Sequence, residues 1–310
     1  MKTKSMRSSY SCSFVPFVAS LLLLSFSGVA HAEQTGTPRR LIAGDYDKKR
    51  LAIVSPDGKL EWEEKIGGEC HDLQVLPNGN VLFQTSWTNV VEMTPKHEVV
   101  WSYDSATMNG NAGKAVQVHA FQRLPDGKTT MLAESGPGRI IEVDRDGKLL
   151  KEIKFKVSKS DPHRDTRLVR KLPDNGHYLV AHEGDNAVRE YDDTGKVVWE
   201  YAVGSRVYSA TRLKNGNTLI GAGDGHRVIE VDPAGKTVWS LNEHDLPGVT
   251  LAWVTMVDRL DNGNTLVVNC HAGPANPQII EVTPDKKLVW SFKDFEHFGN
   301  ALPVALLLKE

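Results

Sequence analysis

The chain has 310 residues, of which 25% are charged and 40% are hydrophobic, so it is long and apolar enough to bury a sizeable core. Its 37 Lys and Arg residues are balanced by 39 Asp and Glu residues, which excludes the basic excess typical of nucleic-acid-binding proteins. We therefore expect a globular protein with no nucleic-acid partner.

Residues 1–32 have the pattern of a secretory signal peptide. Residues 2–7 form a basic start, residues 14–24 an apolar stretch, and residues 30–32 a small-residue cleavage site. The apolar stretch is too short for a spanning helix, and no later segment approaches twenty apolar residues. We predict cleavage near Ala32, a secreted or periplasmic location without a membrane span, and one domain over residues 33–310.

One pattern recurs along the mature chain and decides the fold prediction. Each copy has β-branched runs separated by Asn-Gly or Asp-Gly-like turns, which are strong hairpin signals. The copies contain LPNGNVLF, LPDGKTTML, LPDNGHYLV, LKNGNTLI and LDNGNTLVV, with turn glycines 40 to 49 residues apart at Gly79, Gly127, Gly176, Gly216 and Gly263. Four short antiparallel strands per copy, lettered A to D from the inside outward, are typical of a propeller blade.

The two ends of the mature chain together supply a sixth blade. Residues 41–64 resemble a copy that lacks strand A, and residues 301–310 resemble the missing strand. Pairing these segments closes the ring and removes its open edges. The predicted fold is therefore an all-β, six-bladed propeller with four antiparallel strands per blade, in which the C-terminal strand completes blade one.

Two residue types recur at equivalent positions and are interpreted as architecture. A tryptophan stands in strand D of five blades, with Leu150 in its place in blade three: Trp62, Trp101, Trp199, Trp239 and Trp290. A glutamate recurs in strand C of five blades: Glu92, Glu142, Glu190, Glu230 and Glu281. We expect each tryptophan to pack against the neighbouring blade and the repeated acid to be structural rather than catalytic.

Histidines gather in one set of loops. The D-to-A and B-to-C loops share one face of a propeller, and eight of the ten mature histidines fall there or at the start of strand A: His71, His119, His163, His182, His226, His244, His271 and His297. Residues that differ between blades are the ones expected to carry function. We predict a polar site around the channel mouth on this face.

Strand A gives this site a more definite form. The position five residues before its last leucine reads His71, His119, Arg167, Tyr208, Thr255 and Pro303 around the six blades. The position three residues before that leucine reads Leu73, Phe121, Val169, Ala210, Val257 and Ala305. We therefore predict a cup with a polar rim and an apolar floor.

Such a cup suits a small anionic or aromatic ligand, since arginine binds oxyanions and histidine and tyrosine exchange protons. The candidate ligand-binding residues are His71, Asp72, His119, His163, Arg167, Tyr208, His226, Trp253 and His271. Alternatively, these groups bond only one another and water. The chain has no HExxH or paired CxxC motif, so we predict no metal site and no cofactor. A disulfide between Cys70 and Cys270 is left open.

Two stretches resemble known propeller families. The GlyLysXaaXaaTrp endings at residues 195–199 and 235–239 resemble PQQ-like repeats of bacterial propellers, and HDLQVLPNGNVLF at residues 71–83 resembles the arylsulfotransferase family. The second resemblance implies sulfuryl transfer through a covalent sulfohistidine in the channel of a six-bladed propeller.

That resemblance also implies roles for residues of the rim. His71 or His119 would be the nucleophile, Arg167 would stabilise the charged sulfuryl oxygens, and His163 or Tyr208 would assist proton transfer. Three functions thus follow from the sequence. The first is binding of a small molecule or a partner protein at the histidine-rich mouth. The others are arylsulfotransferase-like catalysis by His71, His119 and Arg167, and a non-catalytic interaction scaffold.

Overall fold

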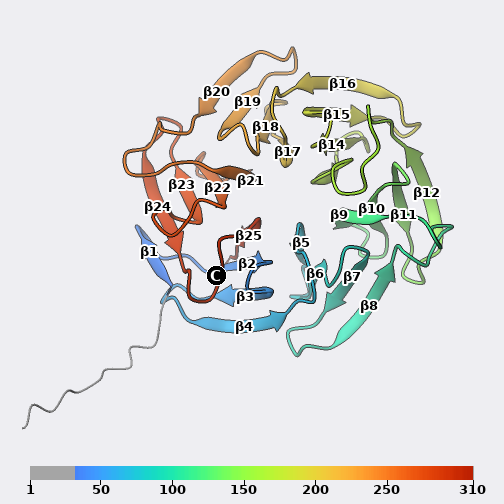
Figure 1. Ribbon diagram of the computed structural model, residues 1–310, viewed down its shortest axis with the longest axis horizontal. Coiled ribbons are helices and arrows are strands. Elements are labelled where there is room, and N and C mark those ends of the chain that lie inside the picture. The colour runs from blue at the N-terminus through green and yellow to red at the C-terminus, as the bar shows by residue number, and fades with distance from the viewer. Residues whose placement is uncertain (1–31, 310) are drawn as a thin grey trace, which may run out of the picture. The chain divides into compact units, whose positions relative to one another are not determined.

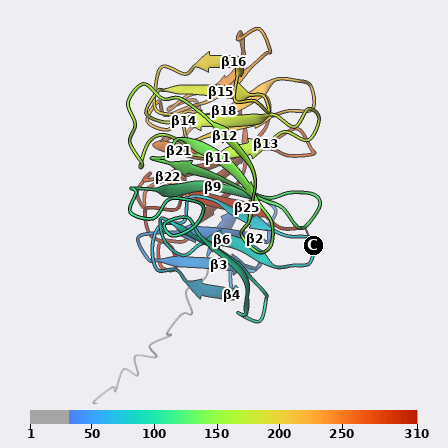
Figure 2. The same ribbon diagram turned by 90° about the vertical axis from the view of Figure 1, so that its right-hand side faces the viewer.

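Antiparallel sheets form a closed ring in the described part of the chain. The computed structural model describes residues 32–309, and every regular element within them is a β-strand. Six sheets are arranged in a ring around a central axis (Figure 1), and Figure 2 shows the same ring from its side. The predicted six-bladed all-β propeller is confirmed. The predicted signal peptide lies outside the described residues apart from Ala32, and residues 32–309 contain no helix able to cross a membrane.

The strands of each blade follow one another from the channel outward. Blade one has β25 (Val304–Leu307), β2 (Leu41–Asp45), β3 (Arg50–Val54) and β4 (Leu60–Lys65), and blade two has β5 (Leu73–Val75), β6 (Val81–Gln84), β7 (Asn89–Met93) and β8 (Val99–Asp104). Blade three has β9 (Gln117–Arg123), β10 (Thr130–Ser135), β11 (Arg139–Val143) and β12 (Leu149–Lys154). Blade four has β13 (Val169–Lys171), β14 (Tyr178–His182), β15 (Ala187–Tyr191) and β16 (Val197–Ala202).

The last two blades continue the same order. Blade five has β17 (Ser209–Arg212), β18 (Thr218–Gly221), β19 (Val228–Val231) and β20 (Thr237–Leu241). Blade six has β21 (Trp253–Arg259), β22 (Thr265–Cys270), β23 (Ile279–Val282) and β24 (Leu288–Lys293), and its outer edge carries β1 (Glu33–Thr35) as a fifth strand. The sequence analysis did not predict β1.

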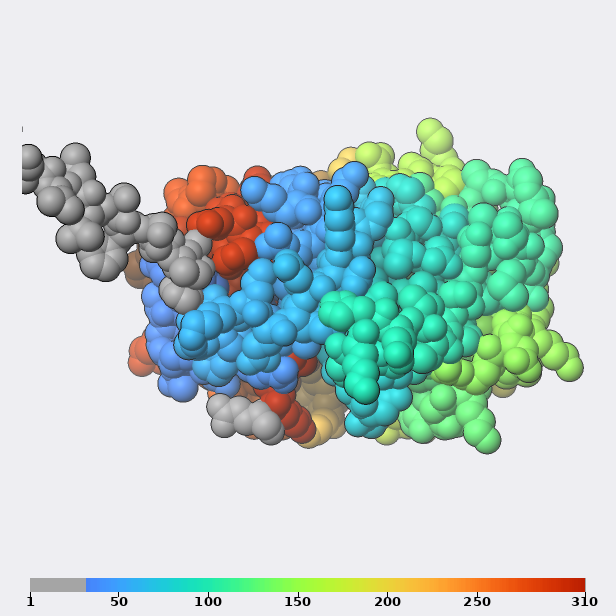
Figure 3. Space-filling view, turned by 90° about the horizontal axis from the view of Figure 1, so that it is seen from below, coloured from blue at the N-terminus to red at the C-terminus, as the bar shows by residue number. Residues whose placement is uncertain are grey.

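Blade one is assembled from both ends of the described chain. β25 pairs antiparallel with β2, with Leu306 opposite Ile42, as the repeat analysis predicted. β1 pairs with β24, so residues that precede blade one also cover the edge of blade six. Figure 3 shows these first residues lying against the orange and red residues of blade six. The ring is therefore fastened twice at one seam.

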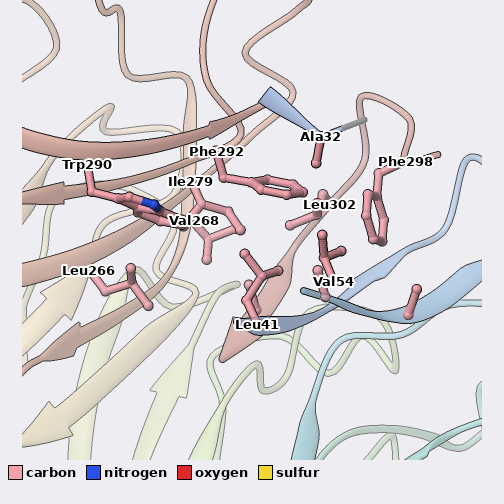
Figure 4. Packing of buried hydrophobic residues seen from close by; sticks show 13 residues of the cluster. Ala32, Leu41, Val54, Leu266, Val268, Ile279, Trp290, Phe292, Phe298 and Leu302 are labelled. Carbon is pink, nitrogen blue, oxygen red and sulfur yellow. The ribbon is translucent and has the colours of Figure 1, made fainter. Parts of the chain in front are cut away.

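A buried apolar cluster fills that seam. Trp290 and Phe292 of blade six face Leu41 and Val54 of blade one (Figure 4), and Trp290 is only 1% exposed. The Trp290 indole N–H donates to Gln34 Oε1 at 2.9 Å, which satisfies the one polar atom of the ring. Burial of side chains of this size stabilises the fold by about 1.5–3 kcal/mol each.

The repeated tryptophans and glutamates form the seams between blades, as predicted. At the seam between blades five and six, Arg259 of β21 lies 5.3 Å from the centre of the Trp239 ring and bonds Glu230 at 2.7 Å. Arg123 with Trp101 and Glu92, and Arg212 with Trp199 and Glu190, repeat the arrangement. The repeated acid is therefore the partner of a cation from the next blade.

The blade-three assignment of Leu150 to the tryptophan position was wrong. Glu142 pairs with Lys151, in the register in which Glu92 pairs with Trp101, and Leu150 is 54% exposed. A shift of one residue in a strand moves a side chain to the opposite face, which explains the error. Lys151 instead lies 5.7 Å from the centre of the Tyr178 ring in blade four.

Candidate functional site

The channel opens into a cavity on the face formed by the D-to-A and B-to-C loops. This mouth cavity has a volume of about 310 Å³ and combines three kinds of side chain. Its arginines are Arg164, Arg167 and Arg206, its histidines are His71, His163 and His271, and its aromatic rings are Tyr46, Trp87, Tyr208 and Trp253. Five of the six predicted rim positions line it, and the sixth, His119, lies directly behind.

His71 occupies the inner wall, just before β5. Its backbone N–H donates to Gln84 Oε1 at 2.9 Å, which fixes the loop that carries it. Its Nδ1 lies 3.1 Å from the Tyr208 hydroxyl, and that hydroxyl donates to the His71 carbonyl oxygen at 2.9 Å. The hydroxyl proton is therefore committed to the carbonyl, so Nδ1 must carry a hydrogen and donate to the Tyr208 oxygen. This arrangement leaves a lone pair on His71 Nε2.

Burial keeps this histidine neutral. Loss of solvent, followed by the charge of Arg167, holds the pKa of His71 well below its usual value. Burial also raises the pKa of the Tyr208 hydroxyl well above its usual value. His71 Nε2 has no hydrogen-bond partner among the described residues, and the Glu69 carboxylate lies 3.8 Å from it. Nε2 is therefore an unpaired hydrogen-bond acceptor or nucleophile on a neutral ring.

Arg167 forms the second half of the inner wall. Its Nε bonds the Glu183 carboxylate, its Nη2 donates to His163 Nε2 at 3.1 Å, and the residue is 5% exposed. The third nitrogen, Nη1, is buried without a partner in residues 32–309. Of the buried unpartnered side-chain atoms in this range, only Arg167 Nη1 and His71 Nε2 belong to residues that line the mouth cavity.

The cavity has an excess of positive charge. Glu183 receives Arg167 directly, while Arg164 and Arg206 lie 3.7 and 4.0 Å from its other oxygen. Burial raises the pKa of Glu183 and the three arginines oppose that shift. His163, which is neutral because burial and Arg167 lower its pKa to about 4, adds no compensating charge. Two carboxylates of the cavity lining, Glu183 and Glu69, thus face three guanidinium groups, of which Arg206 also lies 3.6 Å from Asp224.

Aromatic rings form the outer walls. Trp87 stacks on His71 with ring centres 5.3 Å apart, and its ring edge meets His163 at 5.1 Å. Across the cavity, Arg206 lies 5.9 Å from the centre of the Trp253 ring. A flat ligand can therefore contact an aromatic surface while its charged group reaches the arginines.

His271 and Tyr46 make a second histidine–tyrosine pair on the rim. The Tyr46 hydroxyl lies 2.8 Å from His271 Nε2, and His271 has a φ of 60°, which is unusual for a residue other than glycine. Burial lowers the pKa of His271 and raises that of Tyr46. This pair therefore gives the cavity another neutral donor and acceptor.

Three residues of the candidate set, Asp72, His119 and His226, do not line the cavity. Asp72 is completely buried in the channel below it, where Arg170 binds both carboxylate oxygens at 2.7 Å; we call this the channel pair. His226 Nδ1 lies 2.8 Å from the Ala252 carbonyl, outside the cavity lining. The sequence analysis placed Asp72 at the mouth, whereas its carboxylate is held by Arg170 and does not line the cavity.

His119 is placed behind the wall rather than on it. The residue is fully buried, its Nδ1 donates to the Thr166 carbonyl at 2.8 Å, and its ring centre is 5.2 Å from that of His71. Burial, followed by the charge of Arg167, lowers its pKa well below the usual value. His119 therefore positions the wall and does not contact a ligand in the mouth cavity.

The remaining histidines of this face serve local structure. His182 is buried between the Asp165 carbonyl and the Tyr191 hydroxyl at 2.7 and 2.8 Å. His297 bonds Asp294, and the His244 side chain is 73% exposed. Cys70 and Cys270 are both buried free thiols, so the disulfide left open by the sequence is not formed.

Sequence analysis missed several residues that line the cavity. Tyr46, Trp87 and Glu183 lie in B-to-C loops, and Glu69 and Arg206 lie in D-to-A loops. All five loops belong to the face that the sequence analysis had singled out. Considering every charged or aromatic residue of those loops, rather than the histidines and strand A alone, would have found them.

The residues of the mouth cavity can bind an anion and accept a hydrogen bond. Arg167 Nη1 supplies a donor in a region of excess positive charge, and His71 Nε2 supplies an acceptor with a fixed tautomer. Within residues 32–309, no group of three His, Cys, Asp or Glu side chains is placed to hold a metal ion. Binding chemistry at this mouth therefore depends on hydrogen bonds, charge and aromatic contact.

Comparison with known proteins identifies the family. The model of the family described as Mal s 1 allergenic protein-like matches residues 46–270, which is more than half of the chain, so the chain belongs to this family. No curated protein matches the sequence significantly.

Solved structures support the fold. A protein of unknown function from Bacteroides caccae is 26% identical, with a TM-score of 0.76 over 88% of this chain and 100% of that one. A streptogramin B lyase is 11% identical, with a TM-score of 0.60 over 90% of this chain and 98% of that one. Virginiamycin B lyase from Staphylococcus aureus with quinupristin is 13% identical, with a TM-score of 0.58 over 86% and 89%. At these identities the two lyases show a shared fold alone.

Proposed function

We propose that this member of the Mal s 1-like family binds a small anionic ligand with a flat aromatic group in the mouth cavity. The observation that carries the proposal is the buried, unpartnered donor Arg167 Nη1 on one wall of that cavity. Leaving a buried polar group unpaired costs about 1–3 kcal/mol, so an anion that accepts a hydrogen bond from Nη1 recovers that free energy.

Charge and shape support the same ligand class. The three arginines around Glu183 favour an anion, because an added negative charge balances the local excess. Trp87 and Trp253 favour a flat body, and the volume of about 310 Å³ lies at the lower end of the range for small-molecule sites. A monocyclic aryl sulfate, phosphate or carboxylate has these properties.

Calorimetry with defined probes tests the proposal. We expect p-nitrophenyl sulfate, p-nitrophenyl phosphate or benzoate to bind the wild type, and Arg167→Met to weaken that binding about tenfold or more through loss of a charged hydrogen bond. His226→Gln is the matched control, because His226 lies outside the cavity lining. Equal affinity in Arg167→Met and wild type, or no binding of any probe, would contradict the proposal and favour a protein-interaction scaffold.

Sulfuryl transfer is a second candidate, favoured by the lone pair on His71 Nε2. In that reaction Nε2 attacks the sulfur of an aryl sulfate, the S–O bond breaks, and the aryl oxide leaves with the bonding electrons. An acceptor phenol then takes the sulfuryl group, its proton passes to solvent, and the Nε2 lone pair is restored. Arg167 Nη1 would stabilise the sulfuryl oxygens.

Turnover separates this candidate from binding alone. The assay follows release of p-nitrophenol from p-nitrophenyl sulfate in the presence of phenol. We expect His71→Gln to abolish turnover if the transfer occurs, whereas p-nitrophenyl sulfate that binds the wild type without any release of p-nitrophenol would exclude catalysis. His244→Gln, an exposed residue, serves as the control.

The proposed site of action is outside the cytoplasm. This part of the proposal is supported by the basic start, apolar stretch and small-residue ending of residues 1–32. Expression of the full chain in a bacterial host, followed by mass spectrometry of the periplasmic fraction, should give a product that begins near Glu33. A full-length product confined to the cytoplasm would contradict it.

A further inference from the structure

A second cavity opens on the channel below the channel pair. This lower cavity has a volume of about 310 Å³ and lies along the strands A of blades five, six and one, with Leu168 and Arg170 of blade four on one side. Its residues are those that follow the mouth-cavity residues along the same strands, such as Ala210 two residues after Tyr208. The buried Asp72–Arg170 pair lies in the channel between the two.

The lower cavity lies where strand A carries short side chains. One equivalent position of strand A in the six blades forms a ring of side chains around the channel, and only half of that ring has long polar side chains. At the position two residues before the last leucine of strand A, blades two to four carry Gln74, Gln122 and Arg170. Gln74 bonds the backbone of Arg123 in both directions, Gln122 accepts from the Lys171 N–H, and Arg170 binds Asp72. These long side chains are each held by hydrogen bonds to another blade, and among them only Arg170 lines the lower cavity.

Blades five, six and one carry shorter or apolar side chains at the same position. They are Thr211, Asp258 and Leu306, and all three line the lower cavity. The rest of the wall is mainly apolar and includes Ala210, Met256 and Leu260. The open half of this ring is therefore an apolar space that borders a single carboxylate on β21.

Asp258 is that carboxylate. No side chain bonds it or forms an ion pair with it within residues 32–309, and the residue lines the cavity while remaining exposed to solvent. Burial raises the pKa of Asp258, the backbone N–H of Arg259 opposes that shift, Asp261 adds to it, and Arg170, whose guanidinium is already held by Asp72, opposes it least. Asp72, Arg170 and Asp258 together leave one uncompensated negative charge beside an apolar cavity.

We propose that the lower cavity binds a small hydrophobic ammonium ion, with its apolar body against Ala210, Met256 and Leu260 and its charged nitrogen on the Asp258 carboxylate. Charge complementarity sets the sign of the ligand, because the adjacent cation is already neutralised and the adjacent anion is not. The apolar walls limit the body to a short alkyl or cycloalkyl group. This site is separate from the mouth cavity and has the opposite charge preference.

Titration with a matched series of probes tests the site. The series is hexylammonium, 1-hexanol and hexanoate, which share a chain and differ in charge. We expect hexylammonium to bind most tightly, with an affinity that falls as salt is added, and hexanoate not to bind. Asp258→Asn should weaken hexylammonium about tenfold, the size of one charge-assisted hydrogen bond, and leave 1-hexanol unchanged.

Two further variants keep the result interpretable. Asp261→Asn removes a neighbouring carboxylate whose side chain is 91% exposed, so it should leave binding unchanged. Thr211→Leu fills the cavity from its wall and should weaken both hexylammonium and 1-hexanol. The thermal unfolding midpoint of each variant reports whether it is folded.

Either of two results overturns the proposal. One is a wild-type protein that does not bind hexylammonium. The other is a hexylammonium affinity that stays within about twofold when Asp258 is replaced by Asn in a folded protein. Because p-nitrophenyl sulfate and hexylammonium report on different cavities, failure at one leaves the other independently testable.

Discussion

The seams between blades and the channel mouth use the same residue types in different ways. At each of three seams, an arginine is covered by an indole ring and bonded to the repeated glutamate, as Arg259 is by Trp239 and Glu230. At the mouth, Arg167 is bonded to Glu183 and lies 6.0 Å from the centre of the Tyr208 ring, but it also lines a cavity, and its Nη1 has no partner. An arginine within a seam holds blades together, whereas an arginine on a cavity wall can meet a ligand.

The largest expected effect is at the closing seam. Trp290→Ala should lower the free energy of unfolding by about 3–5 kcal/mol, because it removes a completely buried ring and its bond to Gln34. Urea unfolding at equilibrium measures it. Trp199→Ala, at a more exposed seam, should cost clearly less. Equal losses of unfolding free energy at the two positions would show that the stability of a seam does not depend on how deeply its tryptophan is buried.

Acid should destabilise the protein through its buried histidines. Burial lowers the pKa of His182 to about 4, so between its unfolded value of 6.5 and pH 4 the unfolded state binds the proton and the folded state does not. The stabilisation is therefore complete above pH 6.5 and is lost as pH falls, by on the order of 2 kcal/mol at pH 4.5. Urea unfolding at pH 7.5 and pH 4.5 measures the loss.

His182→Gln isolates this contribution. The variant should show a smaller difference in unfolding free energy between the two pH values, whereas the exposed His244→Gln should match the wild type. A pH dependence unaltered by His182→Gln would place the effect at the other buried histidines of the mouth, His71 and His119.

Replacing an arginine at a seam should affect stability, whereas replacing an arginine at the mouth should affect ligand binding. Arg123→Met should lower the free energy of unfolding by about 1–2 kcal/mol, because Glu92 keeps Arg145 and Asn80 as partners but loses the buried one. It should leave p-nitrophenyl sulfate affinity unchanged. Arg167→Met should lower that affinity. Calorimetry and urea unfolding on both variants test the contrast, which fails if Arg123→Met weakens binding as much.

The smallest effect is expected at a repeated turn. Gly127 has a φ of 69°, and a Cβ added there would meet no atom within 4 Å, so Gly127→Ala should cost only the backbone strain, about 1 kcal/mol. Gly127→Asn should cost less, since asparagine tolerates this conformation. Thermal unfolding of the two variants gives the comparison. A larger loss for Asn than for Ala would show that the turn is limited by space instead.

The sequence predicted the fold well because propeller blades repeat. The structure contains the predicted turn glycines, the recurring tryptophan and glutamate, and the split blade. These predictions were reliable because the same pattern occurs in several blades. Errors arose where a signal occurred once. Leu150 was assigned to a position that Lys151 occupies, an error of one residue, and β1 has no counterpart in the other blades.

The candidate site could be predicted only in part. Counting along strand A located His71, Arg167 and Tyr208, because their spacing from a repeated leucine is fixed. The same count placed an apolar floor beneath them and overlooked the channel pair of Asp72 and Arg170, whose partnership crosses from blade two to blade four. Contacts across the channel depend on the curvature of the ring, which no local pattern encodes.

The pairing of β2 with β25 has a consequence for how the protein is made. Leu41–Gly44 meet partners that are 260 to 266 residues later in the chain, so blade one cannot form until the ribosome has delivered Val304–Leu307. Contacts of such long range carry a high entropic cost and slow folding. The ring therefore closes in one late step of folding, when β25 pairs with β2. Until that step, the edge of β2 in a nascent chain has no paired strand.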